Sequence, residues 1–142
     1  MGRRDLRAQG GFTMPKRKVL VAGASGLVGG AAVRHFAQLK DWDVVGVSRH
    51  IPAGLEGVTL LSVDLTDQRC CAEVFGQMPD VTHLVYAAVN ETPGLIQGWR
   101  DREQMATNLA MLENLCEPLT AAKEKVRELF KELFEEGGKI TN

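Results

Sequence analysis

The chain has 142 residues, a charged fraction of 25% and a formal net charge of -1 at pH 7. This length is sufficient for one hydrophobic core and one domain. The near-neutral balance argues against binding to nucleic acid or to an acidic substrate through bulk electrostatics. No apolar run approaches the ~20 residues of a membrane span, and the N-terminal stretch has no apolar segment typical of a secretory signal. We therefore expect a cytoplasmic protein with no membrane or nucleic-acid partner.

The three cysteines, Cys70, Cys71 and Cys116, lack the spacing of zinc or redox sites. Adjacent Cys70 and Cys71 could pair only through a strained ring. We expect unpaired thiols that are buried or half-buried. The histidines have no neighbouring acidic or cysteine constellation, so we expect no metal site.

Residues 19–30 read VLVAGASGLVGG, an apolar run that enters a glycine turn and continues directly into a helical pattern. In such a unit Gly23 allows the tight turn, Gly26 leaves room for a pyrophosphate, and Gly29 lets the helix pack on the strand. The first N–H groups of that helix would face an anion with the positive end of the macrodipole. Ser25 adds a hydroxyl donor. The stretch predicts a nucleotide-binding turn, with an ordinary structural turn as the alternative.

Short apolar runs typical of buried strands recur at residues 43–48, 58–63 and 81–88. A strand, helix and strand at this spacing form a right-handed parallel crossover. The pattern predicts an α/β fold, a Rossmann-like doubly wound parallel sheet of order 3-2-1-4 flanked by helices. We divide the chain into a flexible arm or extension at 1–15, a dinucleotide-binding domain at 16–122, and a C-terminal amphipathic helix and tail at 123–142.

Three helices are expected from apolar residues at helical spacing. The first begins in the glycine turn, ends at Lys40-Asp41, and has an apolar stripe formed by Val28, Ala31, Ala32, Phe36 and Leu39. The second has Thr66 as its N-cap and an apolar face formed by Cys71, Val74 and Phe75. The third has a stripe of Met105, Leu109, Leu112, Cys116 and Leu119 and is interrupted near Pro118.

A further amphipathic helix follows and is expected to end at Gly137-Gly138. Its apolar stripe consists of Val126, Leu129, Phe130, Leu133 and Phe134. We expect this stripe to cover a sheet face, since an open sheet would otherwise expose apolar surface. Pairing with a second copy, as a homodimer, or with a partner helix is the alternative.

The residues after the second strand indicate which dinucleotide fits. Sites for NAD usually place an acid ~20 positions after the glycine turn, to bind the ribose 2′-hydroxyl. This chain has Ser48-Arg49-His50 there, and a guanidinium suits a 2′-phosphate. The prediction is NADP(H) rather than NAD(H), with Arg49 as an ordinary exposed loop arginine as the alternative.

Two later positions fall at the same edge of the predicted sheet. Asp64 could accept a hydrogen bond from an adenine amino group, with Leu65 packing nearby, or it could cap the next helix. Ala87 and Ala88 are small enough for a cofactor to lie against backbone, or they are small because a helix crosses there.

Together GASGLVGG, SRH, VDLTD, THLVYAAVN and the Asn108 of MATNLAMLENL resemble an extended or atypical short-chain dehydrogenase/reductase of the NAD-dependent epimerase/dehydratase superfamily. DVTHLVYAA and NLAMLENL are most similar to the progesterone 5β-reductase and iridoid synthase-like reductases, which reduce enones and enals with NADPH. The resemblance extends over about 18–122 and implies an NADP(H)-dependent oxidoreductase. It implies that the cofactor is lined by Gly23, Ser25, Gly26, Leu27, Arg49, Asp64, Leu65, Ala87 and Ala88, with support from Asn108. Gly29 and Ser48 complete the predicted cofactor-binding set.

Enzymes of this kind use a tyrosine and a lysine that follow the Asn-bearing helix. The one tyrosine here is Tyr86, in the fourth predicted strand, and the residue four positions on is Asn90. We therefore expect the cofactor-binding half of such an enzyme without its own catalytic Tyr and Lys, truncated or engineered after residue 122. The alternative is a non-catalytic dinucleotide-binding or helix-mediated interaction module.

Overall fold

The computed structural model describes residues 16–51, 56–90 and 102–141, so the predicted arm at 1–15 lies outside the described residues. The strands are β1 (Arg17–Ala22), β2 (Trp42–Ser48), β3 (Val58–Ser62) and β4 (His83–Tyr86). The helices are α2 (Leu27–Ala37), α3 (Gln68–Phe75) and α5 (Arg102–Thr141). The third and fourth strands are shorter than predicted, and α2 ends before Lys40.

The strands form one parallel sheet of order β3-β2-β1-β4, which confirms the predicted topology. β1 pairs on both edges, with Ala22 opposite Val47 of β2 and opposite Tyr86 of β4. Its residues from Val19 to Ala22 are fully buried, as expected for an apolar run in a sheet covered on both faces. The carboxyl ends of all four strands therefore meet at one edge.

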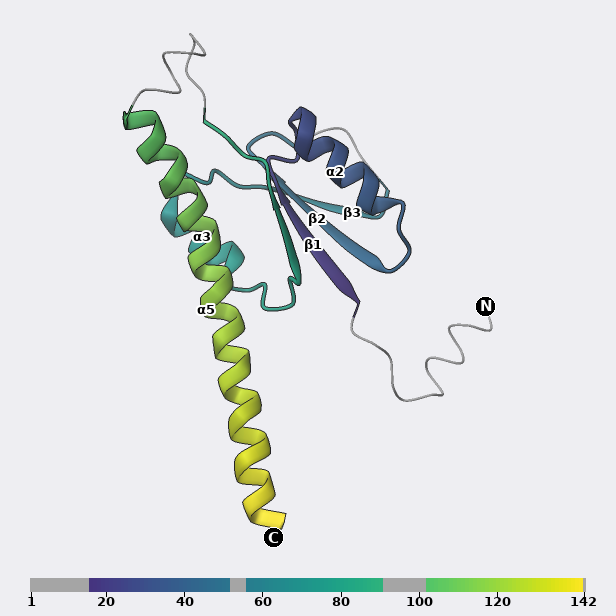
Figure 1. Ribbon diagram of the computed structural model, residues 1–142, viewed down its shortest axis with the longest axis vertical. Helices are drawn as coiled ribbons and strands as arrows, with labels where there is room; N and C mark the ends of the chain where they lie inside the picture. Colours follow the sequence, from purple (N-terminus) through teal and green to yellow (C-terminus); the bar gives the residue numbers. More distant parts are fainter. Residues whose placement is uncertain (1–15, 52–55, 91–101, 142) are drawn as a thin grey trace.

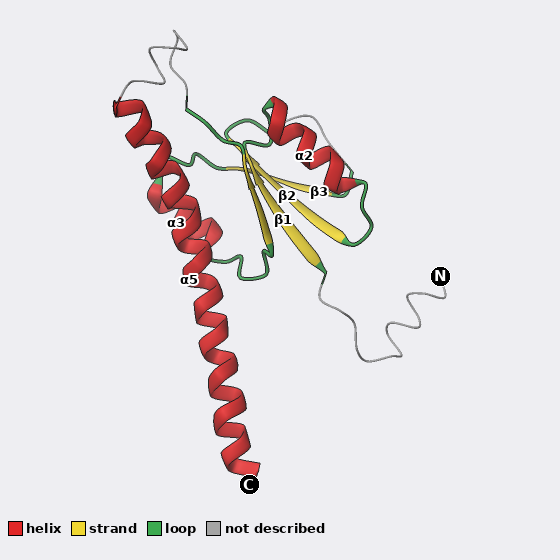
Figure 2. Ribbon diagram, viewed as in Figure 1, coloured by secondary structure: helices red, strands yellow, loops and turns green. Residues whose placement is uncertain are grey.

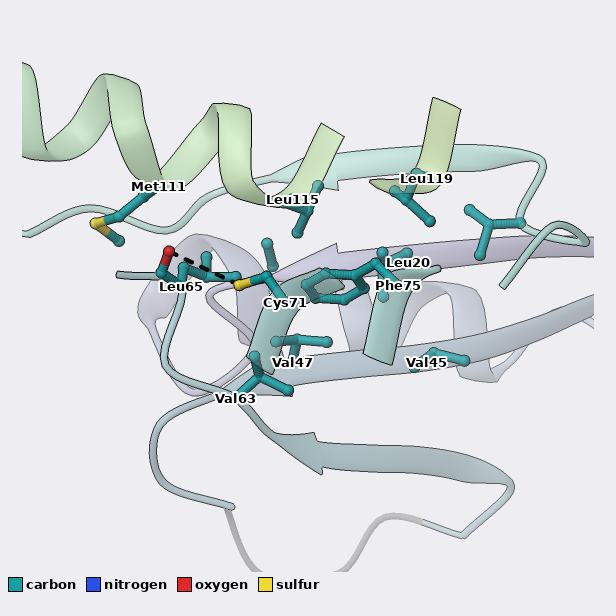
Figure 3. Close-up of a cluster of buried hydrophobic side chains, with 12 residues drawn as sticks. Leu20, Val45, Val47, Val63, Leu65, Cys71, Phe75, Met111, Leu115 and Leu119 are labelled. Carbon is teal, nitrogen blue, oxygen red and sulfur yellow. Dashed lines mark hydrogen bonds between the residues drawn. The ribbon is translucent and has the colours of Figure 1, made fainter. Parts of the chain in front are cut away.

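Helices cover both faces of the sheet (Figures 1 and 2): α2 lies on one face, and α3 and α5 lie on the other. Alternate residues of β1 point to opposite faces. Val19 and Val21 pack with Val33 of α2, whereas Leu20 packs with Phe75 of α3 and with α5. Figure 3 shows the second cluster, in which Met111, Leu115 and Leu119 of α5 face Phe75 and Cys71.

The three cysteines are unpaired, and they are buried or half-buried as predicted. Cys71 is fully buried in the cluster beneath α5. Burial, assisted by the neighbouring Cys70, raises the pKa of the Cys71 thiol to about 11. The thiol is therefore protonated at neutral pH and acts as a small apolar core residue.

The face of α2 that packs on the sheet agrees with the predicted stripe at Ala32 and Phe36, which pack against the core, but differs from it elsewhere. Val28 is 67% exposed and Ala31 is exposed, while Gly29, Gly30 and Val33 are buried. A Cβ built on Gly29 would lie 1.9 Å from the carbonyl oxygen of Gly23. The helix therefore presents its glycines to the turn, because close backbone approach determines the packed face rather than the largest apolar side chains.

The N-cap of α3 is Asp67 and not Thr66. The Asp67 carboxylate accepts a hydrogen bond from the backbone N–H of Cys70 at 3.0 Å, which satisfies one of the free N–H groups of the first turn. The Thr66 hydroxyl instead donates to Asp64 at 2.7 Å. The predicted apolar face of α3 is confirmed at Cys71 and Phe75, both fully buried.

The third and fourth predicted helices form one continuous helix, α5, that passes through Pro118 and Gly137-Gly138. Proline removes one backbone hydrogen bond, but Leu115 and Leu119 on either side are buried in the core, and this packing stabilises the helix across Pro118. Glycine costs only about 1 kcal/mol in a helix and does not end one by itself.

The N-terminal half of α5 agrees with the predicted stripe only in part. Leu119 is buried and Cys116 packs against the core as predicted. Met105 and Leu109 are more than half exposed, and Met111, Leu115 and Ala122 are buried instead. Both sets recur at helical spacing, so periodicity does not distinguish them. Contact with Phe75 and Leu20 selects the buried set.

The C-terminal half of α5 extends past the sheet (Figure 1). Val126, Leu129, Phe130 and Leu133 are 40 to 72% exposed, so the expectation that this stripe covers a sheet face is wrong. The side chain of Phe134 lies outside the described residues. No helix in the described part of the chain is long and apolar enough to cross a membrane.

The two adjacent helical glycines of α2 should respond differently to substitution. Gly29→Ala places a Cβ against the Gly23 carbonyl, and we expect it to lower the free energy of unfolding by about 3 kcal/mol. In the control Gly30→Ala, the nearest atoms are 3.3 Å away on the flexible Arg34 side chain and 3.4 Å away on the Ala24 carbonyl oxygen. This control should stay within about 1 kcal/mol of the parent, since alanine also favours the helix. Urea unfolding followed by circular dichroism measures both, and equal midpoints for the two variants would contradict this packing.

Candidate functional site

A cleft of about 180 Å³ lies at the carboxyl edge of the sheet. The turn between β1 and α2 forms one wall, the segments after β2, β3 and β4 form others, and α5 contributes one side chain. The lining residues are Gly23, Ser25, Gly26, Val47, Ser48, Arg49, Val63, Asp64, Leu65, Thr66, Ala87, Ala88, Val89, Asn90 and Met111. Open α/β sheets bind ligands at this edge, where strand order reverses.

The glycine turn brings backbone, rather than side chains, to the cleft. Gly23 has a φ of 83°, and a Cβ there would lie 2.7 Å from backbone atoms of Ala87 and Ala88. Gly26 is the N-cap of α2, with no side chain to cap it, and a Cβ at Gly26 would meet only the Gly23 carbonyl oxygen at 3.4 Å. The first N–H groups of α2 thus lack a hydrogen bond to a capping side chain, and they lie beside the cleft. This arrangement suits a bound anion.

Two serines connect the glycine turn to the end of β2. The Ser48 hydroxyl donates to Ser25 Oγ at 2.7 Å and accepts from the backbone N–H of His50 at 3.2 Å. Ser48 is buried, whereas Ser25 is exposed at the cleft. A hydroxyl therefore faces the cleft beside the helix N-terminus.

Arg49 and Asp64 provide opposite charges on the rim of the cleft. The carbonyl of Arg49 accepts from the Ser62 hydroxyl at 3.0 Å, which holds the turn after β2. Asp64 accepts from the hydroxyl and the backbone N–H of Thr66. These bonds, with a smaller contribution from the positive charge of Arg49, hold the pKa of the Asp64 carboxyl below its ordinary value. Asp64 is therefore ionised at neutral pH, and it does not cap α3.

α5 fixes the far wall of the cleft. The Asn108 side chain accepts from the backbone N–H of Asn90 at 2.6 Å and donates to the Asn90 carbonyl at 3.1 Å. Met111 lines the cleft, and Ala88 packs against the core cluster that includes Met111. Both explanations given for the small size of Ala88 are therefore compatible with the structure: it packs against the cluster beneath α5, and it also lines the cleft.

Most residues of the predicted set converge on the cleft, but three lie elsewhere. Leu27 is 89% exposed and outside the lining, and Gly29 is buried beneath the turn. Asn108 is connected to the cleft through Asn90. Lining residues that sequence reasoning missed are Val47, Val63, Thr66, Val89, Asn90 and Met111. All except Met111 lie within two residues of predicted positions at strand ends, whereas Met111 depends on the rotation of α5.

Tyr86 does not face the cleft. It packs against the core cluster beside Cys71 and Cys116, and its buried hydroxyl has no hydrogen-bond partner among the described residues. Burial raises the pKa of this tyrosine above its ordinary value. In the part of the chain that the structure describes, no group of three or more His, Cys, Asp or Glu side chains is arranged to hold a metal ion.

Comparison with known proteins shows the family to which the chain belongs. Residues 19–130 match the model of the NAD dependent epimerase/dehydratase family, and the chain belongs to this family. No curated protein matches the chain.

Solved structures share the fold at low sequence identity. Aldohexose dehydrogenase from Thermoplasma acidophilum is 20% identical, with a TM-score of 0.63, over 76% of this chain and 44% of that one. A short chain dehydrogenase from Leptospira borgpetersenii with bound NAD+ is 17% identical, with a TM-score of 0.57, over 80% and 46%. The UDP-Glc/GlcNAc 4-epimerase of Campylobacter jejuni is 17% identical, with a TM-score of 0.60, over 75% and 35%. The chain thus spans less than half the length of each of these proteins.

Proposed function

We propose that the cleft binds a nicotinamide dinucleotide and that the chain is the cofactor-binding part of a cytoplasmic short-chain dehydrogenase/reductase-like oxidoreductase. The observation that carries this proposal is the turn at the start of α2, where a Cβ at Gly26 would make only an ordinary contact with the turn at 3.4 Å. A Cβ at Gly23 or Gly29 would instead clash with backbone. That geometry fits a pyrophosphate against backbone N–H groups. Family membership and the Leptospira relative with bound NAD+ support the same ligand.

Arg49 supports a preference for NADP(H) over NAD(H). It lines the cleft directly after β2, where its guanidinium can form two parallel hydrogen bonds with a 2′-phosphate. The neighbouring positions Ser48 and His50 provide no acid to bind a free 2′-hydroxyl. Asp64, the acid on the rim, is already hydrogen-bonded to Thr66.

The chain's own residues bind and orient the cofactor, which when bound supplies the hydride for the reaction. The resemblance to enone and enal reductases suggests an activated carbon–carbon double bond as the acceptor. Tyr86, the one tyrosine of the chain, has its hydroxyl in the core and not at the cleft. We therefore propose that this chain lacks the catalytic Tyr and Lys, and that a proton donor comes from another segment or partner.

Gly26→Val should abolish dinucleotide binding and leave the fold intact. The added side chain would occupy the space proposed for the pyrophosphate, and its Cβ makes only an ordinary contact at 3.4 Å with the turn. Titration with NADPH and NADH, followed by nicotinamide fluorescence, measures binding, and thermal unfolding checks the fold. Parent-like affinity in the folded variant would refute this placement of the cofactor.

Arg49→Asp should reverse the preference between the two cofactors. The substitution removes the partner of the 2′-phosphate and adds a like charge, so NADPH affinity should fall by at least about tenfold while NADH affinity changes little. The control Arg69→Asp makes the same change of charge on the exposed side of α3, where Arg69 pairs with Glu73 at 3.9 Å. If the ratio of NADPH to NADH affinity is unchanged in Arg49→Asp, Arg49 does not contact the 2′-phosphate and is an ordinary exposed loop arginine.

A second function, a helix-mediated interaction module, is favoured by one observation. The stripe of Val126, Leu129, Phe130 and Leu133 is exposed on a helix that extends past the sheet. Exposed apolar stripes at this spacing are typical of helices that bind another helix. In this proposal the chain forms a homodimer or binds a partner helix through the C-terminal half of α5.

Size-exclusion chromatography with light scattering tests self-association. If the stripe pairs with a second copy, the parent should be a dimer at micromolar concentration, and Leu133→Glu should convert it to a monomer. The control Glu132→Gln changes an adjacent residue of the same helix without placing a charge in the stripe, and it should remain dimeric. A parent that is monomeric throughout excludes the homodimer.

A further inference from the structure

One buried hydroxyl connects the turn after β2 to the glycine turn. Ser48 is only 9% exposed, and its Oγ accepts from the His50 N–H and donates to Ser25 Oγ. Removing a hydroxyl from water costs free energy unless it is hydrogen-bonded. These two bonds therefore hold Ser48 and both of its partners in fixed positions.

The hydrogen bonds run in one direction along this chain of groups. A serine hydroxyl has one proton to donate and lone pairs that accept. Ser48 accepts from the backbone of His50 and gives its proton to Ser25. Ser25 thus receives a hydrogen bond and keeps its own proton for another acceptor. Because Ser25 is exposed in the cleft, this donor faces the space that a bound ligand would occupy. Hydrogen bonds in series polarise one another, so the last donor is strengthened.

We propose that Ser48 is a positioning residue that acts through Ser25, making the Ser25 hydroxyl a directed donor to a phosphate oxygen of the ligand. This inference rests on the proposed function, since the phosphate belongs to the dinucleotide. Two phosphate groups have the required chemistry: the pyrophosphate at the start of α2 and the 2′-phosphate beside Arg49. Only the pyrophosphate is common to NADPH and NADH.

A double-mutant cycle tests the inference. Fluorescence titration with NADPH and with NADH gives affinities for the parent, Ser48→Ala, Ser25→Ala and the double variant. Ser48→Ala should weaken binding about fivefold, the size expected for one lost hydrogen bond. Ser25→Ala should lose at least as much. The double variant should bind no more weakly than Ser25→Ala, since Ser48 acts only through Ser25. Equal losses of affinity for both cofactors would identify the pyrophosphate as the acceptor of the Ser25 hydrogen bond. A loss of affinity for NADPH alone would identify the 2′-phosphate.

Thr59→Val is the matched control. Thr59 lies opposite Val45 on β3, is exposed, and is not among the residues that line the cleft. The variant removes a hydroxyl from the same sheet without touching Ser25 or the turn after β2, so both affinities should stay within about twofold. Circular dichroism checks that each variant is folded. Should Ser48→Ala not fold, Ser48→Cys replaces it, because the thiol keeps nearly the same volume with a weak donor.

The outcomes separate the two proposals. A folded parent that binds neither cofactor overturns the proposed function and this inference with it. A parent that binds NADPH while Ser48→Ala, or Ser48→Cys in its place, binds equally well overturns the inference alone. Additive losses from Ser48→Ala and Ser25→Ala also overturn it, because they would mean that Ser48 does not act through Ser25.

Discussion

The structure depends on a contact between backbones that only glycine permits, where the start of α2 lies against the turn after β1. A Cβ at Gly29 would come within 1.9 Å of the Gly23 carbonyl oxygen, and one at Gly23 would meet the backbone of Ala87. The N–H groups of Gly23 and Ala24 both donate to the carbonyl of Val47, at 2.9 and 3.0 Å. One short turn thus joins β1, α2, β2 and the end of β4. This wall of the cleft is therefore formed by closely packed, hydrogen-bonded backbone.

The remaining walls are held by side chains that bind the backbone of neighbouring segments. Ser62 fixes the turn after β2 through the Arg49 carbonyl. Two asparagines of α5 hold the segments after β3 and β4: Asn114 donates to the Leu65 carbonyl at 2.9 Å, and Asn108 binds both backbone groups of Asn90. α5 thus serves two purposes, since it covers one face of the sheet and also positions two walls of the cleft. Each of these contacts binds a backbone group of a cleft segment and does not use that segment's side chains.

Strand order, parallel pairing and the position of the cleft could be predicted from the sequence. Apolar runs such as VLVA are buried whichever neighbour they acquire, and the crossover rule restricts how they connect. Residues at strand ends, such as Ser48, Arg49 and Asp64, meet at one edge because the strands are parallel. The spacing of the glycines could also be interpreted from the sequence, because a tight turn and close helix packing require residues without a Cβ at these positions. Arg49 as a determinant of cofactor choice stays a prediction, as does the absence of catalytic Tyr and Lys.

Periodicity identified only part of the buried face of α2 and of α5. In α2 the glycine face packs and Val28 is exposed; in α5 Met111 is buried and Leu109 is not. Both alternatives satisfy the same 3.6-residue repeat, so only contacts with distant residues distinguish them. The continuity of α5 through Pro118 also depends on tertiary contacts, since the burial of leucines on both sides outweighs one missing hydrogen bond.

The sequence by itself determined the strands, their order and the glycine turn, because local patterns and chain connectivity suffice for these. Only the tertiary structure decided helix rotation, the Asn108 and Asn114 contacts and the Ser48–Ser25 pair, because these require atoms far apart in the chain to meet.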